Sequence, residues 1–227
     1  RTLDPRTAPR TPEGDIDLES PACLDMDLLG EHLNALARGE EIHLPRYNFV
    51  TRVQSGPIGR PMRLGKDEVA VCEGIHALND DIAAYCPDAF RLYISARSIV
   101  VDNDGREVFK GTWMRLLRRL VRDSNFRGTP AAATLDMWAN VRRGEKRFIS
   151  PFKERANLMF DSSFPCEVSI LKNYAAPLLA AVPEGAERYA EIRSILPALE
   201  RFETIDPALL APESMLREFI GGGVYSY

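Results

Sequence analysis

The chain has 227 residues, of which 45% are hydrophobic and 27% charged, and its formal net charge is −4. This is the composition of a globular protein with a core of its own, and it excludes disordered and fibrous chains. No run of 18 apolar residues and no apolar leader occurs, so we expect a cytoplasmic protein without a membrane span. The mildly acidic balance argues against nucleic acid as a partner.

The order of the predicted elements is that of an α/β fold. Residues 1–20 are predicted to form a loop, and a helix capped by Asp25 ends at Gly39. Strands are predicted at 42–49, 69–72, 90–96 and 158–160. The continuous apolar run at 69–72 predicts a strand buried on both faces. Helical patterns cover 112–127, 131–143, 166–181, 186–202 and 213–220. Strands that alternate with helices predict a mostly parallel sheet flanked by helices.

Two short motifs have the chemistry to contact a nucleotide or a nucleoside. Glu73 and Gly74 follow the run at 69–72, and an acid at the end of a buried strand can hold Mg²⁺, directly or through water. A cap on the following helix is the alternative for this carboxylate. Tyr47 and Phe49 flank Asn48, so the aromatics can stack on a base whose edge the amide binds. Taken alone, such a triplet is more often part of a core.

Positive charge is concentrated between Arg106 and Arg155, where 13 Lys and Arg residues face five Asp and Glu. Helical spacing aligns four of the arginines in one basic stripe, which consists of Arg115, Arg118, Arg119 and Arg122. The guanidinium fork matches phosphate, so the stripe predicts a phosphate site, with surface salt bridges as the alternative. A second basic cluster predicts a loop that closes over a polyphosphate, or else a solvated loop, and contains Arg142, Arg143, Lys146 and Arg147.

Six segments, in this order, are similar to those of the uridine kinase and phosphoribulokinase family, and most of all to its bacterial nucleoside kinase branch. They are residues 16–21, 44–49, 71–79, 115–123, 141–145 and 216–222. The resemblance implies a P-loop kinase fold and a partial nucleoside kinase-like domain at 1–223. Within it we expect a loop at 1–20, a lid region at 130–155 and a carboxyl-terminal helical extension at 183–227.

No Gly-x-x-x-x-Gly-Lys-[Ser/Thr] motif occurs in the sequence. The resemblance places the family's P-loop upstream of residue 1. We therefore expect that this chain begins inside a longer protein, lacks the amino-terminal P-loop unit and is inactive alone.

The resemblance implies ATP-dependent phosphorylation of the 5′-hydroxyl of uridine or cytidine, with ATP and Mg²⁺ as cofactors. It leaves open whether the protein is a homo-oligomer. The residues implied to bind the nucleoside are Glu19 at the sugar, and Tyr47, Asn48, Phe49 and Arg52. Those implied at the reacting phosphate are Glu73 near magnesium, Arg119 and Arg122. Phosphate and lid contacts fall on Arg115, Arg118, Arg142, Arg143 and Arg147.

Two alternatives remain at this point. Trp113, Met114 and Thr129 depart from residues common in the family. These departures are expected of a non-catalytic relative that binds a nucleotide or a nucleoside without turnover. A kinase of another sugar alcohol, such as ribulose 5-phosphate, is the second alternative, and a comparison of acceptors would separate it from a uridine or cytidine kinase.

Overall fold

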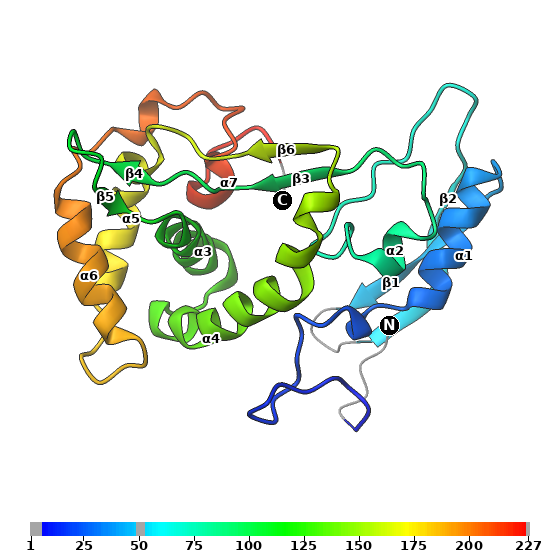
Figure 1. Cartoon of the computed structure of the whole chain (residues 1–227), viewed down its shortest axis with the longest axis horizontal. Helices are drawn as coiled ribbons and strands as arrows, with labels where there is room; N and C mark the ends of the chain where they lie inside the picture. Colours follow the sequence, from blue (N-terminus) through cyan, green and yellow to red (C-terminus); the bar gives the residue numbers. More distant parts are fainter. Residues whose placement is uncertain (1–5, 49–52, 226–227) are drawn as a thin grey trace. The chain divides into compact units, whose positions relative to one another are not determined.

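The computed structural model describes residues 6–48 and 53–225 and divides into two compact units (Figure 1). Unit 1 contains residues 1–93 and 140–159, and unit 2 contains residues 94–139 and 160–227. The predicted subdivision at 1–20, 130–155 and 183–227 stays a prediction. No helix in the described part of the chain is long and apolar enough to cross a bilayer.

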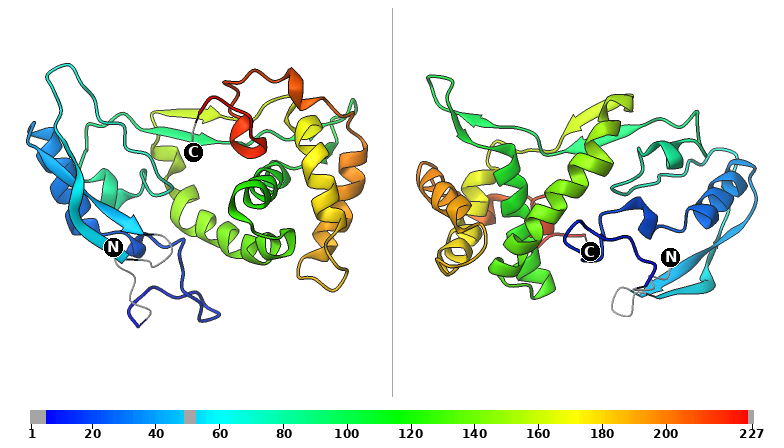
Figure 2. Two further views of the ribbon diagram at one scale, coloured as in Figure 1. Left: turned by 180° about the vertical axis from the view of Figure 1, so that it is seen from behind. Right: turned by 60° about the horizontal axis from the view of Figure 1, so that its bottom comes forward.

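Unit 1 begins with a loop and the short helix η1 (Pro21–Cys23), followed by α1 (Met26–Ala37). The predicted cap is confirmed, because the Asp25 carboxylate accepts a hydrogen bond from the Leu28 amide at 3.3 Å. The chain leaves α1 through Gly39, whose φ of 71° favours glycine. Leu33 and Leu36 of α1 are buried, and the helix lies along a β-hairpin (Figure 2).

The hairpin consists of β1 (Ile42–Asn48) and β2 (Val53–Met62), which pair antiparallel. The extended segment predicted from residue 42 is confirmed up to residue 48. β2 was not predicted from the sequence, because two prolines and two glycines in its ten residues resemble turn signals. The register shifts on both sides of Pro45 show how the ladder accommodates residues that cannot donate.

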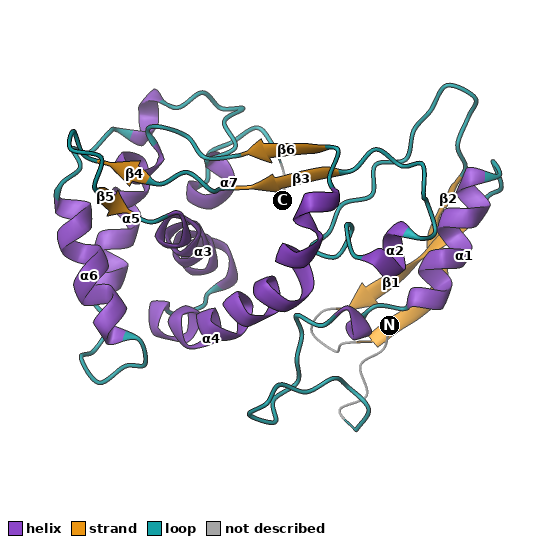
Figure 3. Cartoon of the chain, viewed as in Figure 1, coloured by secondary structure: helices purple, strands orange, loops and turns teal. Residues whose placement is uncertain are grey.

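The parallel sheet is smaller than the sequence predicts. β3 (Leu92–Ser95) and β6 (Leu158–Asp161) form a two-stranded pair whose arrows run in the same direction (Figure 3). Asn157 donates to the Arg91 carbonyl and Ser162 to the Ser95 carbonyl, a nearly constant offset that only parallel strands produce. Among the described residues, the hairpin and the pair β4 (Val100–Val101) with β5 (Glu107–Phe109) are antiparallel. The structure is therefore α/β with a small parallel sheet and antiparallel strands.

The prediction of a buried strand at 69–72 is wrong for this structure. The run has no strand conformation, and the side chains of Val69 and Val71 are 83% and 87% exposed. An apolar run forms a doubly buried strand only where neighbouring strands satisfy its backbone groups on both sides. No described strand pairs with this run.

Unit 2 is built on helices, and four of its five predicted helices are confirmed. They are α3 (Gly111–Arg127), α4 (Ala131–Gly144), α5 (Glu167–Ala180) and α6 (Tyr189–Glu200), of which α4 ends in unit 1. The helix predicted at 213–220 is reduced to α7 (Arg217–Ile220), which follows the short 3₁₀ helix η4 (Pro207–Leu209). Another short helix, α2 (Asp80–Ala83), belongs to unit 1 and lies between β2 and β3 in the chain. The apolar faces of α3, α5 and α6 form the core, whose fully buried side chains include Leu116, Leu117, Leu120, Ile170, Leu171, Leu179, Ile192 and Ile195.

The helical path continues beyond α4 with a change in its winding. A π-helical turn, η2 (Glu145–Ile149), follows Gly144 directly, and the 3₁₀ helix η3 (Ser150–Arg155) follows it. Short π-helical turns are rare in proteins and are frequent at functional sites. These three elements occupy the range predicted as a lid.

A buried carboxylate joins α3 to α4. Asp123 is 2% exposed, and its oxygens lie 3.3 Å from Arg119 Nε and 3.0 Å from Arg127 Nη1. The Thr134 hydroxyl of α4 donates to the same carboxylate at 3.2 Å. Without this carboxylate the buried Thr134 hydroxyl would lose its acceptor and the mostly buried Arg119 its counter-charge, so Asp123 fixes the turn between the two helices.

Replacing Asp123 by Ala should lower the free energy of unfolding by about 3 kcal/mol, because the mostly buried Arg119 loses its carboxylate and the buried Thr134 hydroxyl loses its acceptor. The urea midpoint of the variant measures this loss. Asp136→Ala, at an exposed position of α4, is the matched control and should stay within roughly 0.5 kcal/mol of the wild type. Equal effects of the two substitutions would contradict the stabilising role of Asp123.

A second carboxylate, that of Asp161, joins the carboxyl end of β6 to the residues that follow β3. Asp161 accepts hydrogen bonds from the Ser163 hydroxyl at 2.7 Å, the Arg97 amide at 3.1 Å and the Ser98 hydroxyl at 2.9 Å. Burial acts to raise the pKa of Asp161, but these hydrogen bonds and that of the Ser163 amide outweigh it, so its pKa lies well below 3.8. The ionised form is therefore favoured by folding.

Because the folded state lowers this pKa, the stabilisation is complete above pH 3.8 and is lost as the pH falls through the lower folded value. Wild type should therefore be more stable than Asp161→Asn at pH 5, and the difference should shrink toward pH 2. Thermal midpoints across this range measure it, with Asp104→Asn, at an exposed position, as the control. A difference independent of pH would refute the assignment.

Candidate functional site

The segment that carries Glu19 is held by its own polar groups. Asp17 is buried, and its carboxylate accepts from the Glu19 amide at 3.2 Å. Its carbonyl accepts from the Cys23 thiol at 3.3 Å, and the Ser20 hydroxyl caps η1 at the Ala22 amide. Side-chain bonds of this kind fix a turn that has no regular ladder. Glu19 is thus half-buried on a preorganised loop.

Glu19 packs against the end of α4. Gly144 is buried there, and a Cβ at this position would come within 2.8 Å of Glu19 Cγ and still closer to Glu19 Cβ. Only a residue without a side chain leaves room for this approach. Neighbouring Arg143 pairs with Glu13 at 3.1 Å and with Asn140 at 2.9 Å, so the same loop is tied to α4 by charge.

The predicted aromatic wall is described in part. Tyr47 is half-buried opposite Gln54, and Asn48 is exposed opposite Val53, both at the end of the hairpin where the chain passes from β1 to β2. Phe49 and Arg52 lie outside the described residues. A cavity of about 480 Å³ opens farther along, between α1 and the hairpin, and is lined by residues that include His32, His43 and Gln54. Glu19, Tyr47 and Asn48, the predicted nucleoside residues that the structure describes, are not among the residues that line it.

Glu73 is exposed on the loop between the run at 69–72 and His76. Mg²⁺ at phosphate sites is commonly held by one or two carboxylates, by water and by the phosphates themselves. An accessible single carboxylate fits that mode of binding. Residues 6–48 and 53–225 contain no group of three or more His, Cys, Asp or Glu that could enclose a metal ion by themselves.

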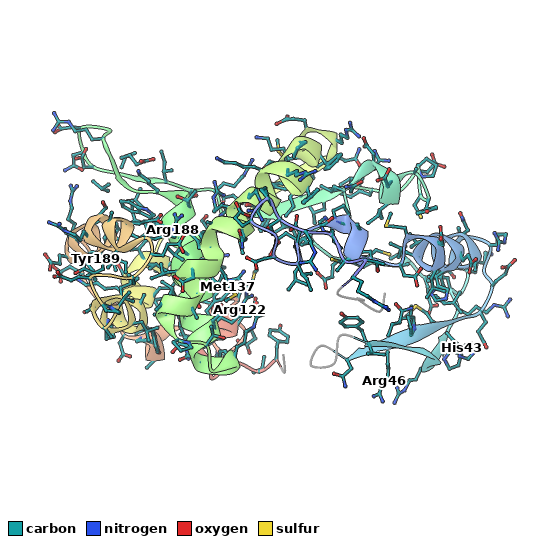
Figure 4. All side chains as sticks on the ribbon, turned by 90° about the horizontal axis from the view of Figure 1, so that it is seen from below. His43, Arg46, Arg122, Met137, Arg188 and Tyr189 are labelled. Atoms are coloured by element: carbon teal, nitrogen blue, oxygen red, sulfur yellow. The ribbon has the colours of Figure 1, made fainter. Side chains whose placement is uncertain are left out.

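The basic stripe on α3 is largely matched by internal carboxylates. Arg118 pairs with the fully buried Glu167 and also donates to the Ser162 carbonyl at 2.7 Å. Arg119 pairs with Asp123 at 3.3 Å, and Arg122, labelled in Figure 4, pairs with Glu218 at 3.1 Å. The side chains of Arg119 and Arg122 are 22% and 28% exposed, against 13% for Arg118. They are therefore the better placed of these three for an incoming phosphate.

The second basic cluster is ordered by local contacts. Arg142 pairs with Glu145 across one helical turn. Arg147 is exposed, and its guanidinium lies 5.0 Å from the Phe148 ring centroid. Arg142, Arg143 and Arg147 therefore lie on α4 and the π-helical turn in unit 1, and the stripe residues lie on α3 in unit 2.

Comparison with known proteins decides the family. Residues 1–168 match the family described as Phosphoribulokinase / Uridine kinase. The chain belongs to this family. It is 27% identical over 157 residues to a uridine kinase of Staphylococcus haemolyticus, which covers 69% of this chain and 67% of that protein. Uridine kinases of Bacillus pumilus and Oceanobacillus iheyensis are each 29% identical over 153 residues. These matches span 67% of this chain and 64% of those relatives.

Sequence reasoning missed the residues that hold the site together. Asp123 lies four positions from both Arg119 and Arg127, so helical spacing could have identified it. Glu167 and Glu218 are 49 and 96 positions from the arginines that they pair with, and no local pattern connects them. Gly144 was part of a basic motif, but its contact with Glu19 has no signal in the sequence.

Gly144→Ala tests the contact with Glu19. Alanine favours a helix by about 1 kcal/mol over glycine. If Glu19 did not pack against this position, the Gly144→Ala variant would therefore be more stable than the wild type. With it, we expect a net loss of about 1–3 kcal/mol from overpacking, measured as a shift in urea midpoint.

The loss should disappear in a Glu19→Gly background, which removes both the Cβ and the Cγ that crowd Gly144. Gly185→Ala is the matched control, because a Cβ there would meet nothing within 4 Å. A cost that persists in the Glu19→Gly background would show that another group crowds this position.

Proposed function

We propose that this chain forms part of an ATP-dependent kinase that phosphorylates the 5′-hydroxyl of a pyrimidine nucleoside, uridine or cytidine. The observation that supports it most is the extent of the family match, which includes every predicted site residue. The relatives named above carry the name uridine kinase. The matched region spans about two thirds of their length, and activity of the whole protein is part of the proposal.

In this proposal the nucleoside is bound by residues of unit 1. The Glu19 carboxylate accepts hydrogen bonds from the ribose hydroxyls, for which a half-buried acid on a fixed loop is suited. Tyr47 and Phe49 provide the aromatic surface for the base, Asn48 bonds its edge, and Arg52 lies beside them. The role of Phe49 and Arg52 rests on the resemblance alone.

ATP supplies the phosphoryl group, and Mg²⁺ offsets the charge on its phosphates. Glu73 holds the metal through water, as its exposed position on a loop allows. Arg119 and Arg122, whose side chains are partly exposed, contact the phosphate through the N–H groups that their carboxylate partners leave available. Arg115 and Arg118 add positive charge to the same stripe. Arg142, Arg143 and Arg147 contact the phosphates from the lid. Such a site acts by positioning and charge neutralisation.

One observation favours the alternative of a non-catalytic nucleoside- or nucleotide-binding relative. Arg118, Arg119 and Arg122 already have carboxylate partners, which reduces the charge they present to a phosphate. The two functions differ in a single readout. A binding protein retains nucleoside without releasing ADP, whereas a kinase releases one ADP for each nucleoside phosphorylated.

The decisive assay measures ADP release with Mg-ATP and either uridine, cytidine or ribulose 5-phosphate. It is run on this chain and, in parallel, on the complete product of its gene. We expect release that depends on uridine or cytidine in the complete product. Glu19→Gln should lower kcat/KM about 10- to 100-fold, the usual effect of losing hydrogen bonds to a charged group.

Glu31→Gln, at an exposed position of α1, is the matched control and should leave kcat/KM unchanged. Nucleoside binding without ADP release in the complete product would support the binding protein instead. ADP release that depends on ribulose 5-phosphate alone would show that the acceptor is this sugar phosphate and not a nucleoside.

A further inference from the structure

The carboxyl-terminal segment at 216–222 resembles the family, yet it has no part in the function proposed above. It lies outside the family match, which covers residues 1–168. Its centre is α7, which packs on α3 within unit 2. Leu216 is fully buried and Phe219 is 8% exposed, so apolar side chains anchor the segment against the rest of the unit.

The polar groups of this segment meet the basic stripe. The Glu218 carboxylate lies 3.1 Å from Arg122 Nη1, and the Asn125 side-chain amide donates to the Phe219 carbonyl at 3.0 Å. The Arg118 guanidinium lies 5.1 Å from the Phe219 ring centroid. Since Arg118, Arg122 and Asn125 follow one another at helical spacing, α7 covers the face of α3 that carries part of the stripe.

The position of α7 does not depend on the ion pair between Arg122 and Glu218. The Arg217 guanidinium donates to the Pro207 carbonyl at 3.0 Å and to the Leu210 carbonyl at 2.7 Å, which ties the helix to the loop before it. The buried Leu216 and Phe219 hold the same helix from the other direction in the chain. Opening the pair would therefore leave α7 in place and move only the Glu218 side chain.

The three acids that pair with the stripe differ in how readily they can leave it. Glu167 has no solvent exposure and Asp123 is 2% exposed, whereas the Glu218 side chain is 33% exposed. Opening a buried pair leaves a charge without water or partner, which is costly, but water replaces the partner in an exposed pair at little cost. Of these three pairs, that of Arg122 is therefore the one that opens most easily.

A phosphate at Arg122 would favour this opening. In the proposed function it contacts the N–H groups that Glu218 leaves available, so it comes close to a carboxylate of the same sign of charge. Like charges at such a short distance repel each other. The partly exposed Glu218 side chain can turn into water, and Nη1 then becomes available to a second phosphate oxygen.

We propose that Glu218 is an exchangeable counter-ion, which occupies Arg122 when no phosphate is bound and gives up Nη1 when a phosphate arrives. It thereby sets the affinity of the stripe for phosphate. The presence of phosphate at Arg122 rests on the proposed function, whereas the ion pair and its exposure rest on the contacts described above.

Binding of tripolyphosphate to this chain tests the exchange without a nucleoside. Calorimetry at low ionic strength measures the Kd. Glu218→Gln removes the negative charge and keeps a side-chain oxygen, and we expect it to lower the Kd about five- to tenfold. Arg122→Gln should weaken binding, and the gain from Glu218→Gln should vanish in the Arg122→Gln background because both residues act on the same contact.

Glu213→Gln is the matched control, because it removes the same charge from an exposed position of the same part of the chain. It should change the Kd by less than about twofold. The urea midpoint of Glu218→Gln should equal that of the wild type, since a partly exposed pair adds little to stability. A difference in Kd then does not arise from a change in folding.

Each other outcome is informative. A Kd that rises in Glu218→Gln would show that Glu218 holds Arg122 ready for phosphate, and it overturns the exchange. A gain that Glu213→Gln reproduces, or that persists in the Arg122→Gln background, reflects net charge alone and overturns it as well. The same holds if neither the wild type nor Glu218→Gln binds tripolyphosphate. If the expected gain is found but the complete gene product releases no ADP, the counter-ion role stands and the kinase proposal fails.

Discussion

Glu167 has no solvent exposure, and its carboxylate is held at the start of α5 by Arg118 of α3. Arg118 Nη2 lies 2.7 Å from Glu167 Oε2, and the Phe164 amide donates to the same oxygen at 3.2 Å. Because a buried charge without its partner costs several kcal/mol, α3, α5 and the end of β6 can be assembled only together. The positions of Arg119 and Arg122 follow from this, since they lie on the same helix as Arg118.

The same interaction changes how a run of arginines is interpreted. A stripe of four guanidiniums suggests a shared external anion as long as the acids that face it are unknown. In the folded chain, acids from α3, α5 and α7 supply part of that negative charge from within. The arginines therefore organise unit 2, and any phosphate that binds there competes with or joins carboxylates already in place.

Local patterns were sufficient for most helices and insufficient for the sheets. The spacing of Leu116, Leu117 and Leu120 predicts the buried face of α3, and Asp25 predicts the start of α1. Strand pairing depends on distant partners, so a proline-rich strand such as β2 was not predicted and the run at 69–72 was wrongly predicted to be buried. The candidate site follows the same rule: sequence identified Glu19 and the arginines, but Gly144, which packs against Glu19, and Glu167 and Glu218, which pair with two of the arginines, come from distant segments.

The π-helical turn at Glu145–Ile149 makes the direction of the side chains that follow it sensitive to a change in length of one residue. Such a turn is equivalent to an α-helix into which a single residue has been inserted. Deleting one residue there would restore α-helical winding and rotate every following side chain by about 100° around the helix axis. Phe148 would then turn away from His76, whereas the length of the helix would hardly change. Related chains that differ by one residue at this point are therefore expected to place a different side chain against the position of His76.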